Sequence, residues 1–305
     1  MSKYSPEYMN HRNAESMSLN AVKQAIRMES ILESRVKKCD SNNNLILDIG
    51  KNIIGIIKFE ELEYHPDGTP IKEASATSKI NKHVKYIPIS IRKEEDVFIV
   101  ECSRKQVQKI CYDNYISKLT PGDVIDAYVL KIMSYGIFCD IGCGIVALLP
   151  TNNISVTHII NPTIELKGNS VLKVVVKNID ENYKIELTHR ELLGTWEEEA
   201  SEINEGEIVY GTVLSVEEYG VFVRISQNLS GLAGTTNIGI KVGDLVSARI
   251  QTIQNKNMKV KMTILEKVGT MEDIPMRFKY KIKDSHIKEW VYSTPTAKKR
   301  IESYF

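Results

Sequence analysis

Long apolar runs are missing from this 305-residue chain, and so is an excess of charge of either sign. No stretch approaches the roughly 18 consecutive apolar residues of a membrane-spanning helix, so no membrane partner is expected. Lysine and arginine number 40 and aspartate and glutamate 39, a net charge of +1, which excludes a broad basic field as the basis of binding. Hydrophobic residues make up 42% of the chain, enough for packed cores.

Cysteine is also scarce. Five scattered cysteines are too few for a disulfide framework and favour a reducing, cytoplasmic location. Residues 1–20 lack the apolar core of a signal peptide and contain Glu7 and Glu15, which supports the same expectation. The cysteines are Cys39, Cys102, Cys111, Cys139 and Cys143.

Signs of catalysis are equally sparse. The six histidines lie in different segments, with no serine, aspartate or cysteine partner at a familiar spacing. No Gly-x-x-x-x-Gly-Lys-Ser phosphate loop occurs. Cys139 and Cys143 flank one turn, but zinc needs four ligands and no second pair follows, so structural cysteines are favoured. We expect no enzyme activity, no cofactor and no metal.

What the chain does contain is a repeat. Tyr135-Gly136-Ile137-Phe138 recurs 84 residues later as Tyr219-Gly220-Val221-Phe222. The similarity extends beyond this phrase on both sides, with a length difference confined to one later connection. Self-similarity of this kind predicts repeated structural units.

Each copy consists of five strand-like runs separated by Gly, Asn, Asp and Pro clusters. Five short strands in about 70 residues predict a small closed barrel, because closure removes exposed sheet edges. The runs are 124–132, 137–141, 145–149, 171–179 and 184–187 in one copy, and 208–216, 221–225, 231–233, 245–253 and 259–263 in the other.

The repeated phrase suggests an exposed aromatic surface. A glycine between two aromatics can create a bulge or bend, which would place Tyr135 and Phe138 on the same outer face. Beyond the bend, alternation would turn Ile137, Cys139 and Ile141 inward and leave Asp140 outside.

The second copy repeats this arrangement, with Phe222 and Arg224 on the outer face near Tyr219. Aromatics beside a basic residue are typical of a surface on which nucleic-acid bases stack. Strand aromatics are also common in cores, and the residues alone leave both interpretations open.

These phrases, with Gly-x-Val before them and Asp-x-Gly after, resemble the S1-type RNA-binding domain, an oligonucleotide-binding (OB) barrel. The resemblance covers 119–193 and 203–266. It implies that single-stranded RNA lies across the aromatic face, with a charged pair at the last hairpin and a histidine assisting. The implied residues are Tyr135, Phe138, Asp180 and Lys184 in one copy, and Tyr219, Phe222, Gln254 and Lys259 in the other; Pro150 and Gly234 occupy the histidine position.

A third, degenerate copy is expected over 31–104. Residues 45–50 echo the strand around Asp140, but Asn42-Asn43-Asn44 stands where the aromatic and glycine would be. This copy keeps the core pattern and lacks the stacking residues, so we expect a docking or spacer role for it.

Helical patterns and a C-terminal extension complete the chain. Ser103 predicts a helix start after the first copy, and Trp196 is expected to pack at the later junction. The C-terminal extension mixes basic and aromatic residues, which fits either nucleic-acid binding or packing of its aromatics on the last barrel. It resembles the tails of short S1-type proteins from Firmicutes and their phages. The expected organisation is 1–30 (helical extension), 31–104 (degenerate barrel), 105–118 (helical linker), 119–190 (barrel), 191–202 (helical linker), 203–268 (barrel) and 269–305 (C-terminal extension).

The sequence therefore predicts a mainly β protein of three tandem S1-type OB barrels that binds single-stranded RNA, most simply mRNA, in translation or mRNA handling. Bases would stack on the two aromatic pairs, while phosphates are neutralised by Lys184, Arg224, Lys259 and Lys261. The small ribosomal subunit is a further expected partner. The alternative is a scaffold whose barrels dock on the ribosome or on a ribonuclease.

Overall fold

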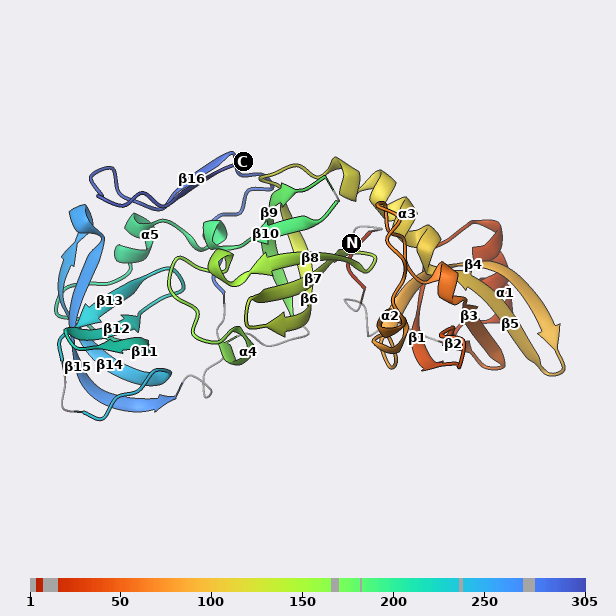
Figure 1. The fold of residues 1–305 in the computed structure, drawn as a ribbon, viewed down its shortest axis with the longest axis horizontal. Helices are drawn as coiled ribbons and strands as arrows, with labels where there is room; N and C mark the ends of the chain where they lie inside the picture. Colours follow the sequence, from red (N-terminus) through yellow and green to blue (C-terminus); the bar gives the residue numbers. More distant parts are fainter. Residues whose placement is uncertain (1–3, 8–15, 166–169, 182, 236–237, 271–277) are drawn as a thin grey trace.

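Three closed five-stranded barrels follow one another along an elongated molecule (Figure 1). The computed structural model describes residues 4–7, 16–165, 170–181, 183–235, 238–270 and 278–305. This architecture confirms the expected fold class. Helices in the described part of the chain are all too short or too polar to cross a bilayer.

The strands of each barrel close in the same spatial pattern, with the last two strands exchanged relative to chain order in all three barrels. The first barrel contains β1 (Leu32–Cys39), β2 (Leu45–Gly50), β3 (Ile53–Ile57), β4 (His83–Glu94) and β5 (Val97–Ser103). The second contains β6 (Val124–Met133), β7 (Gly136–Gly142), β8 (Ile145–Pro150), β9 (Val171–Ile179) and β10 (Ile185–Thr188). The third contains β11 (Ile208–Glu217), β12 (Gly220–Arg224), β13 (Ser230–Ala233), β14 (Asp244–Gln254) and β15 (Lys259–Thr270).

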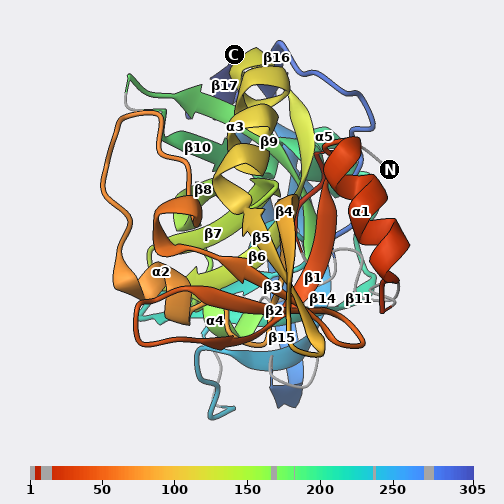
Figure 2. The ribbon, with the colours of Figure 1, turned by 90° about the vertical axis from the view of Figure 1, so that its right-hand side faces the viewer.

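Short helices lie beside and between the barrels. Figure 2 looks along the long axis from the first barrel and shows α1 against one flank of it, where Val22 joins that barrel's core. Ser103 caps α3 by accepting the N–H of Gln106, as its position predicted. The helices are α1 (Leu19–Arg27), α2 (Glu73–Thr77), α3 (Arg104–Asn114), α4 (Pro162–Glu165) and α5 (Trp196–Ala200), with 3-10 turns η1 (Phe59–Glu61), η2 (Ile116–Lys118), η3 (Thr151–Asn153), η4 (Arg190–Leu193) and η5 (Asn255–Asn257).

Alternating side chains fill the barrels, as the sequence pattern predicted. In β7, Ile137, Cys139 and Ile141 are at most 1% exposed and belong to the core of the second barrel. In β12, Val221 and Val223 are 2% and 0% exposed and belong to the core of the third barrel. The other face of each of these strands is therefore the one left for binding or for contacts between modules.

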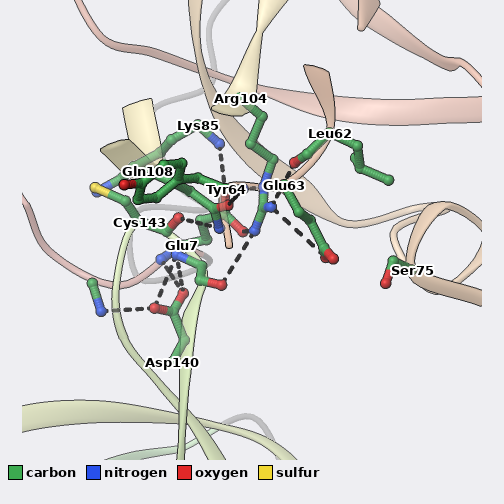
Figure 3. Close-up of polar contacts among 12 residues, drawn as sticks. Glu7, Leu62, Glu63, Tyr64, Ser75, Lys85, Arg104, Gln108, Asp140 and Cys143 are labelled. Carbon is green, nitrogen blue, oxygen red and sulfur yellow. Dashed lines mark hydrogen bonds and ion pairs between the residues drawn. The ribbon is translucent and has the colours of Figure 1, made fainter. Parts of the chain in front are cut away.

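A buried polar cluster joins the first barrel to the second (Figure 3). The Arg104 guanidinium, at the start of α3, donates to both carboxylate oxygens of Glu7 (2.9 and 3.0 Å) and to the Leu62 carbonyl (2.9 Å). The Glu7 N–H donates to the Asp140 carboxylate of the second barrel (2.7 Å). Glu7, Arg104 and Asp140 are all completely buried. The N-terminal segment 4–7 therefore ties the linker helix and both barrels together.

The second and third barrels meet around Trp196, which is 2% exposed. Its ring lies in the third barrel's apolar cluster together with Val175 of the second barrel, and its Nε1–H donates to Asn255 (3.4 Å). The predicted packing of this tryptophan at a junction is confirmed.

The C-terminal extension forms a hairpin of β16 (Glu289–Val291) and β17 (Glu302–Tyr304). Trp290 and Tyr292 are 3% and 5% exposed and belong to the third barrel's core cluster. Of the two interpretations of this extension, packing on the last barrel holds for these aromatics. Residues 271–277, where part of its basic and aromatic pattern lies, fall outside the described residues.

Candidate nucleic-acid interface

The two repeated aromatic pairs have the same geometry. The Tyr135 and Phe138 ring centroids lie 6.1 Å apart with an interplanar angle of 87°, and those of Tyr219 and Phe222 lie 6.3 Å apart at 87°. The tyrosines are 57% and 67% exposed, while both phenylalanines are half-buried. In each pair, the tyrosine ring is open to solvent and the phenylalanine, which is fixed in the sheet, packs edge-on against it. We call each pair an aromatic platform.

The tyrosine owes its position to a tight turn. Met133 pairs with Gly136 across β6 and β7, so Ser134 and Tyr135 form a two-residue hairpin loop. The glycine was expected to bend the chain between the two aromatics. The register shift lies instead in the preceding strand, between Val129 and Lys131, and the turn itself brings the rings to one face.

The glycine of the phrase serves close packing. A Cβ on Gly136 would lie 2.7 Å from the Leu149 carbonyl oxygen, and one on Gly220 would lie 2.4 Å from that of Ala233. Any side chain would push the neighbouring strand away from the barrel wall. The glycine therefore fixes how closely the aromatic hairpin approaches the next strand.

Strand register defines a row of four neighbouring positions across the outer face of the second barrel. Phe138 pairs with Lys131 on one side and Leu148 on the other, and Leu148 pairs with Glu186. Lys131 is exposed and lies beside the aromatic ring. Lys131 is not among the phosphate contacts expected from the sequence, because only the register shift in β6 reveals that it faces Phe138.

The third barrel has the same row with different charges. Phe222 pairs with Ser215 and Leu232, and Leu232 pairs with Lys261. Lys261 is exposed, as is Lys259 two residues before it on the same face of β15. The structure thus brings two of the expected phosphate-binding lysines next to the aromatic pair.

In the first barrel the row is aliphatic at its centre. Ile46 takes the place of the phenylalanine and pairs with Lys38 and Ile56, and Ile56 pairs with Glu101. This register explains in structural terms why the first copy lacks a stacking surface.

The last hairpin of the second barrel lies beside its aromatic pair. The Lys184 N–H donates to the Asp180 carboxylate (2.8 Å), which closes the turn, and Tyr183 sits in the left-handed region with 49% of its surface exposed. Asp180 therefore has a structural task at this turn. A groove of about 380 Å³ runs between this hairpin and the platform, and is lined by Phe138, Val146, Ala147, Leu148, Asn178, Asp180, Tyr183, Lys184, Ile185 and Glu186.

Two outer-face residues differ from their expected exposure. Arg224 is only 8% exposed, so its charge is not presented to solvent beside Phe222. Asp140 is completely covered by the N-terminal segment and accepts N–H groups of Glu7, Gly142 and Gly144. Burial and the nearby Glu7 carboxylate raise the pKa of Asp140 to about 7. Alternation placed both correctly on the outer side, but contacts distant in the sequence cover them.

Within the described ranges, no three His, Cys, Asp or Glu side chains converge as metal ligands would. What the arrangement offers is flat aromatic surface with lysines at its edge. Such a surface suits stacking of bases and neutralisation of phosphates.

Part of the chain is similar to known proteins. Residues 118–190 match the family model of the S1 RNA binding domain. The small ribosomal subunit protein bS1 of Staphylococcus saprophyticus is 26% identical over 50% of this chain and 42% of its own length, and bS1 of Chlamydia muridarum is 24% identical over 72% and 40%. The chain thus spans about two fifths of the length of these relatives.

A solved multidomain protein with nucleic acid binding domains from Streptococcus pneumoniae matches 78% of this chain and 74% of its own length, at 12% identity and a TM-score of 0.25. The family match falls on the barrel that carries Tyr135 and Phe138. Residues 118–190 of the chain are therefore similar to the S1 RNA binding domain.

Proposed function

We propose that this protein binds single-stranded RNA through the second and third barrels and acts on mRNA in translation or mRNA handling. The observation that supports this most directly is the pair of exposed, edge-braced tyrosines at equivalent turns of two barrels. The similarity to bS1 proteins supports the same function and makes the small ribosomal subunit the expected partner. We also propose that the protein binds RNA without cleaving it. RNA that stays intact after long incubation with the protein and magnesium would agree with this.

In the proposed mechanism one base stacks on each open tyrosine ring, and the phenylalanine holds that ring in place. Stacking is worth about 1–3 kcal/mol per base and tolerates different sequences. Lys131 and Lys184 beside one platform, and Lys259 and Lys261 beside the other, are the candidates for phosphate contacts. Arg224 is left out of this set because it is buried.

Two weak platforms in one chain reinforce each other. Once one platform holds an RNA strand, the second binds at the effective concentration that the connection sets, provided the strand reaches both. The buried Trp196 junction limits the relative movement of these two barrels. The four lysines beside the platforms alone predict a shallow dependence of binding on salt, with a slope near −2 to −3.

The alternative function is a protein-binding scaffold. The row of Ile46 and Ile56 on the first barrel favours it there, because this row has no ring on which a base could stack. For the later barrels, the exposed tyrosines favour RNA.

The test is fluorescence anisotropy with a labelled unstructured RNA and the variant Tyr135→Ala/Tyr219→Ala. Its matched control is Tyr210→Ala/Tyr304→Ala, since each of these tyrosines is 65% exposed and lies away from both platforms. We expect the platform variant to lose about 1–3 kcal/mol of binding free energy per ring and the control to bind as the wild type does. Equal binding by both variants would contradict the proposal, and so would a salt slope steeper than about −6.

A further inference from the structure

The basic and aromatic residues of the C-terminal extension are separated in the structure. Trp290 and Tyr292 are buried in the third barrel's apolar cluster and anchor the extension. Lys298 and Lys299, in the loop between β16 and β17, are exposed. The aromatics therefore hold a basic loop at a fixed place on the surface.

This loop is closed by its own hydrogen bonds. The Ser293 hydroxyl donates to the Lys299 carbonyl (2.9 Å) and accepts the N–H of Ile301 (2.7 Å). The N–H of Ala297 donates to the Thr294 carbonyl (3.0 Å), which forms a turn. The backbone on both sides of the lysines is thus held in one conformation.

The loop lies against the tip of the β14–β15 hairpin. The Thr294 hydroxyl donates to the carbonyl of Asn255 in η5 (3.0 Å). Figure 1 shows the end of the C-terminal hairpin beside this tip, at the far end of the molecule from the first barrel. Lys256 follows Asn255 directly, so a lysine of this tip stands next to the residue that the C-terminal loop contacts.

The same hairpin leads back to the aromatic platform. Lys261 neighbours Leu232, which neighbours Phe222. Lys259 is on the same face, about 6.6 Å closer to the tip at the usual rise of a strand, and Lys256 is at the tip. We call Lys261, Lys259, Lys256, Lys298 and Lys299 the lysine track.

The charges of the track are available for a ligand. All five lysines are exposed, and none has an ion-pair or hydrogen-bond partner for its ammonium group among the residues that the structure describes. Arg300, which follows Lys299 directly, is not part of the track, because its guanidinium pairs with the Glu302 carboxylate at 3.0 Å. Of the acidic residues near the tip, Glu205 already accepts the N–H of Ile253. A polyanion that leaves the platform toward the tip can therefore bind these lysines without displacing an ion-pair partner among the described residues.

We propose that the lysine track is a phosphate-binding extension of the third barrel's platform, along which the RNA backbone continues from Phe222 to Lys298 and Lys299. The proposal rests on the proposed RNA binding and names the part of the surface that the strand follows beyond the stacked bases. The second barrel has no such extension, since the described tip of its hairpin carries Glu181 beside Asp180 and Lys184.

The experiment compares Lys298→Gln/Lys299→Gln with Lys283→Gln/Lys288→Gln in the full chain. The control pair lies in the same extension, is exposed and removes the same charge, but precedes β16 and is distant in sequence from the loop. Binding of a labelled oligouridine of about 30 nucleotides, long enough for two OB-fold sites, is measured from 50 to 200 mM salt. Thermal unfolding checks that both variants are folded.

If both lysines contact phosphates, the slope of log K against log salt becomes shallower by about 1.4 in the loop variant. The ratio of wild-type to loop-variant affinity for RNA then falls about 7-fold between 50 and 200 mM salt. The control should keep the wild-type slope. If the loop variant has the same salt slope as the control while Tyr219→Ala still weakens RNA binding, the proposed role of the lysine track is refuted and RNA binding by the platform is retained. Absence of RNA binding by the wild type would overturn both proposals.

Discussion

Replacing Arg104 with methionine should destabilise the unit formed by the first two barrels. Methionine is long and apolar, so it fills much of the space of the arginine but leaves the Glu7 carboxylate buried without its partner. In the native protein, burial acts to raise the pKa of Glu7, but the charge and hydrogen bonds of Arg104 outweigh it and hold the pKa below its usual value. The Lys85 N–H also donates to this carboxylate (3.0 Å), but Arg104 is the largest of the contributions that lower the pKa, so Glu7 is charged and depends mainly on this guanidinium.

The magnitude follows from the burial of the pair. Both side chains are 0% exposed and are joined by two parallel hydrogen bonds of 2.9 and 3.0 Å. Breaking a buried pair by removing one partner typically costs about 3–5 kcal/mol, whereas replacing both partners by apolar residues is often close to neutral. In a unit of roughly 190 residues each kcal/mol lowers the Tm by about 2–4 °C, so Arg104→Met should lower it by about 6–20 °C.

Calorimetry at pH 7 measures this loss, with Arg92→Met as the control. Arg92 also pairs with two carboxylates, but its side chain is 51% exposed, so little change in Tm is expected. A double variant with Glu7→Met should recover part of the loss. Because the folded-state pKa of Glu7 is lowered, its stabilising contribution is lost on acidification, and the difference between wild type and Arg104→Met should narrow below about pH 4.5. An Arg104→Met Tm within 2 °C of the wild type would refute the argument.

Two further predictions concern single buried positions. His189 is completely buried, and burial lowers its pKa to about 4. As the pH falls, the unfolded chain takes up the proton before the folded chain does, so the free energy of unfolding should fall by about 3 kcal/mol between pH 6.5 and 4. This fall should disappear from the pH profile of unfolding in His189→Leu. Gly136→Ala should cost about 1–3 kcal/mol because its Cβ would meet the Leu149 carbonyl, while Gly234→Ala, with nothing within 4 Å of its Cβ, should unfold as the wild type does.

Local alternation was enough to predict the barrels. The sequence pattern placed a strand over 171–179, and β9 spans Val171–Ile179. It ended the last strand of the third barrel at residue 263, whereas β15 continues to Thr270. The pairing of β14 with β15 contains three register shifts, and each shift breaks the alternation on which the prediction relied.

The outer faces were harder to predict, because residues distant in the sequence decide what covers them. Asp140 follows the alternation, yet its carboxylate binds Glu7, 133 residues away. Lys131 was missed for a related reason, since its place beside Phe138 depends on a bulge in β6 that leaves no glycine or proline as a signal. The aromatic pairs could be predicted because the repeat itself, and not a pattern of burial, pointed to them.

The charges around the two platforms have a consequence for how one RNA strand could bind both. In the second barrel the lysine nearest the phenylalanine, Lys131, lies on β6, and the far end of the row carries Glu186, which pairs with Lys177 at 2.7 Å. In the third barrel the near position is Ser215 and the lysine, Lys261, occupies the far end. Within this row, the lysine therefore lies on opposite sides of the aromatic pair in the two barrels, whereas Lys184 of the second barrel and Lys259 of the third both lie on the side of the last hairpin. An RNA backbone that follows the last hairpins can therefore keep to one side of the stacked bases in both barrels, along Lys184 and then Lys259 and Lys261, while Lys131 offers a further cation on the other side in the second barrel.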